Sequence, residues 1–273
     1  MLLLSFVITL FAFALLWAIH IPIKNAGVVD FYWGPGFAVI GIFYWFGSGN
    51  FSIPQFVLLA LICIWAARLS FYLVARFLQH SSEDRRYTAM RGQGGANFWW
   101  VSLFKIFTLQ AVIMWIIASP VHVGLLSSNI ESDTNSLVIL GALLFVVGFT
   151  IEIFADRQLS AFKKQNPGGD ALFTSGLWSW SRHPNYFGEA VLWWGLGIIA
   201  FSISSSFWAF LGPATLTLVM VGVSAVITDR HMADSRQEKY SSYFQSTSNF
   251  VPSPPGLRLT PRSSSTKKDR TAL

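Results

Sequence analysis

Residues 181–202 read SRHPNYFGEAVLWWGLGIIAFS, a polar start followed by an apolar run of the length that crosses a bilayer. A transmembrane helix needs roughly 20 mostly apolar residues. Pro184 suits the first turn of a helix, where its missing N–H removes no hydrogen bond. The pattern therefore predicts a membrane-spanning helix that begins near Pro184, with its polar first turn at one membrane surface.

Six further stretches have the same apolar character and length. The seven predicted spans lie at about 1–21, 29–47, 54–78, 98–120, 136–156, 185–202 and 207–228. The sequence of 273 residues is 53% hydrophobic and only 12% charged, about half the charged fraction of an average soluble domain. No alternating strands recur at the ~10-residue spacing of a β-barrel. The sequence thus predicts an all-α fold, a polytopic membrane bundle of seven transmembrane helices.

Lysine and arginine residues predict the orientation of this bundle. The connections that contain Lys or Arg all lie on one side of the predicted membrane, and they are 22–28, 79–97, 157–184 and the tail after 228. Those without Lys or Arg are 48–53, 121–135 and 203–206. Because cytoplasmic loops have an excess of these residues, we expect the N-terminus outside and the C-terminus in the cytoplasm. The net charge of +6 then reflects topology, and no nucleic-acid partner is expected.

The chain shows no sign of a soluble domain. We expect residues 1–251 to form one membrane domain and residues 252–273 to form a disordered basic cytoplasmic tail, since this segment is rich in Pro, Ser and basic residues. Such a tail could touch anionic membrane lipid. The single cysteine, Cys63, excludes a disulfide framework, and the five histidines lack metal-ligand spacing. No metal site is therefore expected.

Ionisable side chains gather toward the cytoplasmic ends of five predicted helices. Together with neighbouring polar residues they are Asp30; Arg68, Tyr72 and Arg76; Glu152 and Asp156; Arg182, Asn185 and Glu189; and Asp229. Spacings of three and four place each group on one helix face. An ionisable residue inside a span usually faces a bundle interior or a cavity. Ion pairs that simply join helices would explain single groups, but a shared cytoplasm-facing polar cavity explains all five.

The segment Ser181–Glu189 gives the strongest local signal for a ligand. A helix that starts at Pro184 would point its free N–H groups and its positive dipole end at this cavity, which favours an anion. Arg182, Lys163 and Lys164 add positive charge nearby in sequence. A cofactor that bears phosphate would fit such a site, whereas a capped helix with an Arg–Glu pair is the structural alternative.

Motifs spread over residues 24–255 give the chain a resemblance to a known family. They are Asp30-x-x-Trp33-Gly34, Arg68-Leu69-x-x-Tyr72, Glu83-Asp84-x-Arg86-Tyr87, Gln110, Asp156-x-Gln158-Leu159-x-x-Phe162-Lys163, Gly176-Leu177-Trp178, Arg182-His183-Pro184-Asn185-Tyr186-Phe187-Gly188-Glu189, and Tyr240-x-x-Tyr243 ahead of Phe250-Val251-Pro252. With them the chain resembles the membrane 3-oxo-5-alpha-steroid 4-dehydrogenase (steroid 5-alpha-reductase) family, especially its prokaryotic-type branch of unknown function. Isoprenylcysteine carboxyl methyltransferases share the Arg-His-Pro-x-Tyr-x-Gly core.

This resemblance implies a seven-helix bundle with a cytoplasm-facing cavity and NADPH as the hydride donor. The residues that would hold the adenosine or ribose region are Asp156 and Asn185. Those that would face phosphate are Arg68, Lys163 and Arg182. The other candidate cofactor-binding residues, which would line the dinucleotide pocket or close it from the tail, are Tyr72, His183, Tyr186, Glu189, Tyr240 and Tyr243.

The substrate-polarising residues depart from the family pattern. The steroid-reducing branch has a Gln-Glu pair on its second helix and a Tyr on its third. No such pair is found here, Asp30 is the only carboxylate on the second helix, and the position three before Arg68 is Trp65. The candidate catalytic donors are therefore Asp30, kept protonated by apolar surroundings, and the phenols of Tyr72 and Tyr87.

The predicted reaction is the reduction of a C=C bond conjugated to a carbonyl in an apolar, steroid-, terpenoid- or lipid-like substrate that enters from the bilayer. Hydride from NADPH would reach the β carbon, and a donor would meet the charge that develops on the carbonyl oxygen. Two alternatives stay open, namely an S-adenosylmethionine-dependent membrane methyltransferase of the isoprenylcysteine type and a non-catalytic lipid-binding protein. We expect an integral multi-pass protein of the bacterial inner membrane or the endoplasmic reticulum.

Overall fold

The computed structural model describes residues 1–49, 51–79, 83, 85–128, 135–167 and 171–255. Seven helical segments in these ranges are long and apolar enough to cross a membrane, which confirms the predicted number of spans. They are Leu2–Ile23, Ala26–Ser48, Ile53–Phe77, Tyr87–Ile117, Ser136–Gln165, Pro184–Ser204 and Phe207–Ser235. The described ranges contain no strands, and their one β-bridge joins Ser181 and Ser248.

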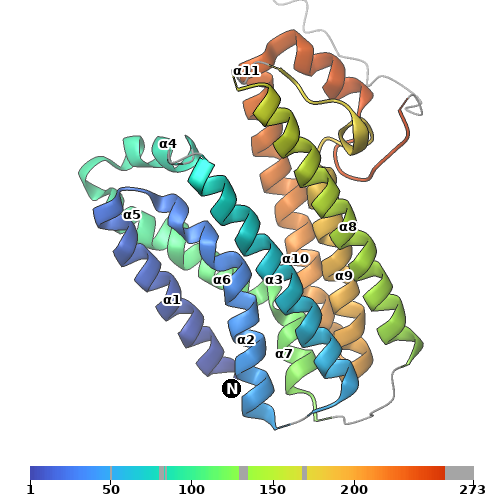
Figure 1. Ribbon diagram of the computed structural model, residues 1–273. Coiled ribbons are helices and arrows are strands. Elements are labelled where there is room, and N and C mark those ends of the chain that lie inside the picture. The colour runs from blue at the N-terminus through green and yellow to red at the C-terminus, as the bar shows by residue number, and fades with distance from the viewer. Residues whose placement is uncertain (50, 80–82, 84, 129–134, 168–170, 256–273) are drawn as a thin grey trace, which may run out of the picture. The chain divides into compact units, whose positions relative to one another are not determined.

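The helical elements follow one another along the chain with few long gaps (Figure 1). In order they are α1 (Leu2–Ile23), η1 (Ala26–Tyr32), α2 (Trp33–Ser48), α3 (Ile53–Gln79), α4 (Arg85–Gly94), η2 (Gly95–Asn97), α5 (Phe98–Ser102), η3 (Leu103–Thr108), α6 (Leu109–Ile117), α7 (Ser119–Leu126), α8 (Ser136–Gln165), η4 (Gly176–Ser179), α9 (Pro184–Ser204), η5 (Phe207–Phe210), α10 (Leu211–Val219), η6 (Met220–Ser224) and α11 (Ala225–Ser246). Helix α9 begins at Pro184, as predicted.

Two helical segments lie outside the predicted apolar runs. Helix α4 occupies part of the segment 79–97, which was expected to be a loop, and the last helical run continues through α11 to Ser246. Both additions are polar, so a search for apolar runs of bilayer length does not find them. Strong helix formers such as Arg, Met, Gln and Glu sustain such polar turns.

The described chain divides into two compact units. The first unit comprises Met1–Phe149 and Glu189–Val219, and the second comprises Thr150–Gly188 and Met220–Leu273. A single domain over residues 1–251 stays a prediction. Of the predicted tail 252–273, residues 256–273 lie outside the described residues.

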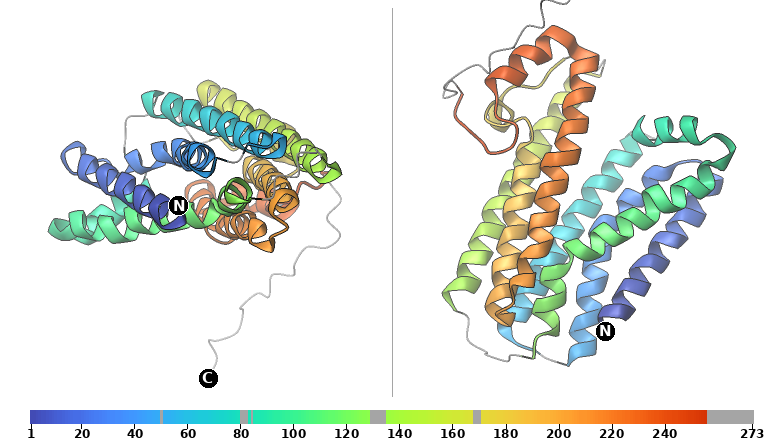
Figure 2. Two further views of the ribbon diagram at one scale, coloured as in Figure 1. Left: turned by 90° about the horizontal axis from the view of Figure 1, so that it is seen from below. Right: turned by 180° about the vertical axis from the view of Figure 1, so that it is seen from behind.

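Helix packing in the first unit centres on α2. Helix α2 packs against α3 and α7, α1 packs against α6, and α10 packs against α6 (Figure 2). At the core of this packing, the rings of Phe37, Trp65 and Trp193 contact one another edge to face, with centroids 4.7–5.6 Å apart. These side chains are fully buried, and each large aromatic ring that leaves water adds substantially to the hydrophobic stabilisation.

A buried polar chain connects four helices of the same unit. Trp115 Nε1 donates to Ser5 Oγ at 3.1 Å, and the hydroxyls of Ser5 and Tyr44 lie 2.5 Å apart. Tyr44 Oη lies 2.9 Å from His122 Nδ1, and His122 Nε2 lies 2.8 Å from the Trp115 carbonyl. Because a carbonyl only accepts, His122 Nε2 bears the proton and Nδ1 accepts from Tyr44. The chain therefore satisfies its buried polar atoms internally and fixes α1, α2, α6 and α7 together.

Candidate functional site

Two of the predicted catalytic residues meet in the first unit. Tyr87, from α4, donates from its hydroxyl to Asp30 Oδ1 at 3.4 Å, and Gln110 Nε2 donates to the same hydroxyl at 3.2 Å. Gln110 Oε1 accepts from Trp33 Nε1 at 2.7 Å, which fixes the orientation of the amide. The Tyr87 side chain is buried. The result is a buried phenol held between an amide donor and a carboxyl group.

Glu83 connects the two elements that provide this phenol and this carboxyl. Its Oε1 accepts from the backbone N–H of Ala26, at the start of η1, at 2.7 Å. Arg91 of α4 binds the carboxylate through both oxygens, at 2.7 and 3.1 Å. Burial raises the pKa of the Glu83 carboxyl, but the hydrogen bonds from Arg91 and Ala26 outweigh it and hold the pKa below its usual range. Glu83 is therefore ionised at neutral pH and positions Asp30 against Tyr87.

Other predicted residues of the first unit lie on α3 and α9. The guanidinium of Arg68 lies over the ring of Tyr72, 5.3 Å from its centroid. Glu189 lies one helical turn before Trp193. The indole Nε1 atoms of Trp65 and Trp193 are buried, and neither has a hydrogen-bond partner among the described residues. A buried unmade hydrogen bond costs about 1–3 kcal/mol, so these two indole N–H groups lower the stability of the core around Trp65.

A single carboxylate organises the second unit. Asp229 accepts from Arg182 Nη2 at 2.9 Å, lies 3.0 Å from His183 Nε2, and accepts from the hydroxyl of Tyr240. Three of the predicted cofactor-binding residues thus converge on Asp229, which the sequence placed in the expected polar cavity without a role of its own. This arrangement connects the start of α9 to α11.

The guanidinium group of Arg182 binds groups within the second unit. Besides Asp229, its Nη1 donates to the carbonyls of Phe244 and Thr247, at 2.7 and 3.2 Å, and its guanidinium stacks on the Phe244 ring at 4.0 Å. The side chain is 5% exposed. The counter-ion of Arg182 in the structure is Asp229, and a contact of Arg182 with a cofactor phosphate stays a prediction. Only its buried Nε has no partner among the described residues.

Tyr240 and Tyr243 are likewise packed rather than presented to a ligand. Both side chains are buried, and the Tyr243 hydroxyl donates to the Trp178 carbonyl at 2.5 Å. Burial and then the hydrogen bond to Asp229 raise the pKa of Tyr240, and burial raises the pKa of Tyr243. The two phenols stay neutral and hold the end of α11 against the segment around Trp178. A role in closing a dinucleotide pocket stays a prediction.

The remaining residues of the second unit form a small polar face where α8 meets the start of α9. Asn185 Nδ2 donates to Asp156 Oδ1 at 3.2 Å, which brings together the two residues predicted to hold a ribose. The rings of His183 and Tyr186 stack at 5.3 Å. Lys163 lies two turns beyond Asp156 on α8. An acidic residue fixed by an amide, next to a helix N-terminus, suits a ribose hydroxyl beside a phosphate.

Three residues of these clusters were not assigned a role from the sequence. Gln110 was named only as one of the motifs of the resemblance, Asp229 only as a member of the expected polar cavity, and Trp193 was not distinguished from the other apolar residues of its span. The sequence features that could have indicated a role were the position of Gln110, a polar residue inside a span, and that of Asp229, an acidic residue at the end of one. Among the described residues, no group of three or more His, Cys, Asp or Glu side chains could hold a metal ion.

Comparisons with known proteins match part of the chain to steroid 5-alpha-reductases. A steroid 5-alpha-reductase of Arabidopsis thaliana is 36% identical over 74 residues, which are 27% of this chain and 26% of that protein. The 3-oxo-5-alpha-steroid 4-dehydrogenase 1 of Bos taurus is 34% identical over 70 residues, 26% of each chain. These matches indicate a membrane oxidoreductase-like protein.

A longer match has no assigned activity. An uncharacterized protein of Schizosaccharomyces pombe is 25% identical over 262 residues, covering 87% of this chain and 75% of that protein. No solved structure matches the chain. The family described as "Protein of unknown function (DUF1295)" matches residues 16–247, nearly the whole described chain, and the chain belongs to this steroid 5-alpha-reductase-like family.

Proposed function

We propose that this protein is a membrane oxidoreductase that uses NADPH to reduce a C=C bond conjugated to a carbonyl in an apolar substrate. The observation that supports it most is the buried Tyr87 hydroxyl between Gln110 and Asp30. It supplies a proton donor in a chain that lacks the Gln-Glu pair of the steroid-reducing branch. The partial identity to steroid 5-alpha-reductases supports the reaction class.

The donor set of the second unit fits a phosphorylated ribose. Asp156 with Asn185 would hold a ribose hydroxyl, and Lys163 with the first N–H groups of α9 would hold phosphate. Arg182 would act indirectly, because its bonds to Asp229 fix the start of α9. NADPH, when bound, supplies the hydride.

In the first unit, the residues around Tyr87 would donate a proton to the substrate and replace it. Tyr87 gives its phenolic proton to the enolate oxygen that forms when hydride adds to the β carbon. Gln110 Nε2 then donates to the phenolate that is left and stabilises it, and Trp33 keeps the amide in that orientation. Asp30, in its protonated form, returns a proton to Tyr87. The enol then becomes the ketone as its O–H proton is lost and a proton is added to the α carbon, and Asp30 regains its proton from water. The substrate has then gained one hydride and one proton.

An apolar substrate and a membrane setting go together in this proposal. Several spans expose large apolar side chains on their outer faces, such as Phe71 on α3 and Leu218 on α10. A substrate dissolved in the bilayer would reach the helices through such faces without crossing water. We propose the bacterial inner membrane or the endoplasmic reticulum as its location, with a steroid-, terpenoid- or lipid-like substrate.

Cofactor binding tests the first half of the proposal. Purified protein in detergent is titrated with NADPH, NADH and S-adenosylmethionine, and Trp fluorescence quenching and thermal stability are followed. We expect saturable quenching by NADPH that Asn185→Ala weakens, because Asp156 then loses its amide partner. Asn97→Ala, an exposed residue of the other unit, serves as the control for general damage. Stabilisation by S-adenosylmethionine alone would instead indicate a methyltransferase, and no response to either would favour a non-catalytic lipid-binding protein.

Turnover of a panel of apolar enones tests the second half. Tyr87→Phe removes the acid, and a general acid contributes about 10²–10⁴-fold to a rate. We therefore expect kcat to fall by about 10² in Tyr87→Phe and to fall in Asp30→Asn, while the Kd for NADPH stays unchanged in both. Full turnover in Tyr87→Phe would show that the proton comes from elsewhere.

A further inference from the structure

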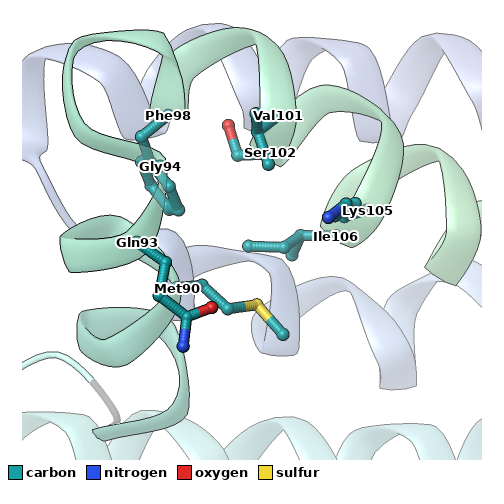
Figure 3. Close-up of a pocket in the computed structure, with 8 residues that line it drawn as sticks. All are labelled: Met90, Gln93, Gly94, Phe98, Val101, Ser102, Lys105 and Ile106. Atoms are coloured by element: carbon teal, nitrogen blue, oxygen red, sulfur yellow. The ribbon is translucent and has the colours of Figure 1, made fainter.

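A cavity of about 160 Å³ lies within the first unit where α4, α5 and η3 follow one another (Figure 3). Its lining residues are Met90, Gln93, Gly94, Phe98, Val101, Ser102, Lys105 and Ile106. They come from a stretch of only 17 positions, so the cavity is a local feature of this folded segment. None of these residues belongs to the two polar clusters described above.

The cavity has a mostly apolar buried part and a polar, exposed rim. Phe98, Ser102 and Ile106 are buried, whereas Gln93 and Lys105 are exposed. Within the part of the chain that the structure describes, no carboxylate pairs with Lys105. A charged rim over an apolar base is the arrangement that an amphiphile requires.

The backbone at this cavity is irregular. Residues Leu103–Thr108 form a π-helical segment between α5 and α6. Such wide turns are rare and are frequent at functional sites. This one includes both Lys105 and Ile106, so the irregular turn builds one wall of the cavity.

An aromatic belt adjoins the cavity on the outer face of the unit. Trp99 and Trp100 are 42% and 48% exposed, and Phe104 is 64% exposed. The rings of Trp17, Trp99, Trp100 and Phe104 follow one another at centroid distances of 4.5–6.4 Å. Trp side chains gather at the depth of the lipid head groups. Lys105 is next in sequence to Phe104, so we expect its ammonium group near the depth at which a phospholipid presents its phosphate.

The volume of the cavity restricts what it can hold. A ligand pocket for a whole cofactor measures roughly 300–1,000 Å³, and a water occupies about 30 Å³. A cavity of about 160 Å³ therefore accepts a group the size of a phosphate with part of its glycerol, and not a dinucleotide. The acyl chains of such a lipid would lie outside it, along the exposed aromatic rings.

We propose that this cavity binds the phosphate-glycerol region of a membrane phospholipid, with Lys105 as the cation that contacts the phosphate. Phe98, Val101 and Ile106 surround the glycerol, and the belt of Trp99, Trp100 and Phe104 supports the acyl chains. The site is independent of the proposed reductase reaction, because it uses none of that reaction's residues. It holds the segment from α4 to η3, and with it Tyr87, at a fixed depth in the membrane.

Native mass spectrometry of the full chain in detergent tests this site, with dioleoylphosphatidylglycerol, dioleoylglycerol and inorganic phosphate as probes. One basic residue near lipid phosphate contributes about 1 kcal/mol, which is roughly fivefold in affinity. We expect Lys105→Gln to weaken phosphatidylglycerol binding about fivefold. Val101→Phe, which fills the cavity without changing charge, should weaken it as well. Lys24→Gln is the matched control, an exposed lysine of the same unit that does not line the cavity.

Each contrary outcome overturns a definite part of the proposal. Equal losses in Lys105→Gln and Lys24→Gln would show that only the general surface charge attracts lipid. Dioleoylglycerol that binds as tightly as phosphatidylglycerol would remove the phosphate contact. Saturation by inorganic phosphate alone would make the ligand a soluble anion. Thermal unfolding of each variant shows whether it is folded, and Lys105→Gln, at an exposed position, keeps the test usable if Val101→Phe does not fold.

Discussion

At the scale of single residues, Asp229 has the largest structural role in the second unit. It compensates the charge of Arg182, whose side chain is 5% exposed, and it also binds His183 and Tyr240. A charge taken out of water is stable only when its partner stays in place. Arg182 and His183, from the segment Ser181–Glu189 that suggested an anion site, thus also fix the start of α9 to Asp229.

We expect Asp229→Asn to lower the free energy of unfolding by about 3 kcal/mol, since removing one partner of a buried pair leaves the other charge uncompensated. Denaturant-induced unfolding in detergent micelles measures this. Asp234→Asn is the matched control, because Asp234 is an exposed residue on the same helix, α11. If both variants unfold alike, Arg182 does not depend on Asp229.

At the scale of elements, small residues determine how closely two helices approach. A Cβ atom at Gly195 of α9 would lie 2.4 Å from the Gly141 carbonyl oxygen of α8, and a Cβ at Gly141 would lie 2.5 Å from that of Gly195. Real Cβ atoms do not tolerate such distances. The two glycines therefore permit the close backbone contact between α8 and α9.

Gly195→Ala should destabilise the protein by about 1–3 kcal/mol, because the added methyl must push α8 and α9 apart. Gly222→Ala is the control, since a Cβ at Gly222 meets nothing within 4 Å; there the gain in helix propensity predicts no loss of stability. Thermal unfolding of both variants in the same detergent gives the comparison. Equal stability of Gly195→Ala and the parent protein would mean that the helices separate without penalty.

At the scale of the whole molecule, orientation follows from the distribution of Lys and Arg over the connections. We expect the C-terminus in the cytoplasm, because the basic residues all fall on one predicted side. A fluorescent protein fused to Leu273 and expressed in bacteria should fluoresce, whereas alkaline phosphatase at the same place should be inactive. Fusions after Ser128, in a connection without Lys or Arg, should show the opposite pattern. Active phosphatase at Leu273 would reverse the topology.

Prediction from the sequence succeeded where the signal was local. The seven apolar runs and the start of α9 at Pro184 depend on stretches of about 20 neighbouring residues, and the structure confirms them. Helix α4 was missed because a polar helix has no apolar run. The structure brings Asp156 and Asn185 together and shows that Arg182 and Tyr240 share the partner Asp229, which the sequence did not indicate. The cofactor-binding roles of these residues stay predictions.

The sequence by itself determined that this chain is a helical membrane protein, because bilayer thickness imposes a fixed length on apolar runs and water fixes where charges fall. Only the tertiary structure decided which polar residues meet. Tyr87 finds Asp30 and Gln110, 57 and 23 positions away, and Arg182 finds Asp229 47 positions away. Such pairs form because a polar group inside a bundle must find its partner on another helix, and the packing of the helices selects that partner.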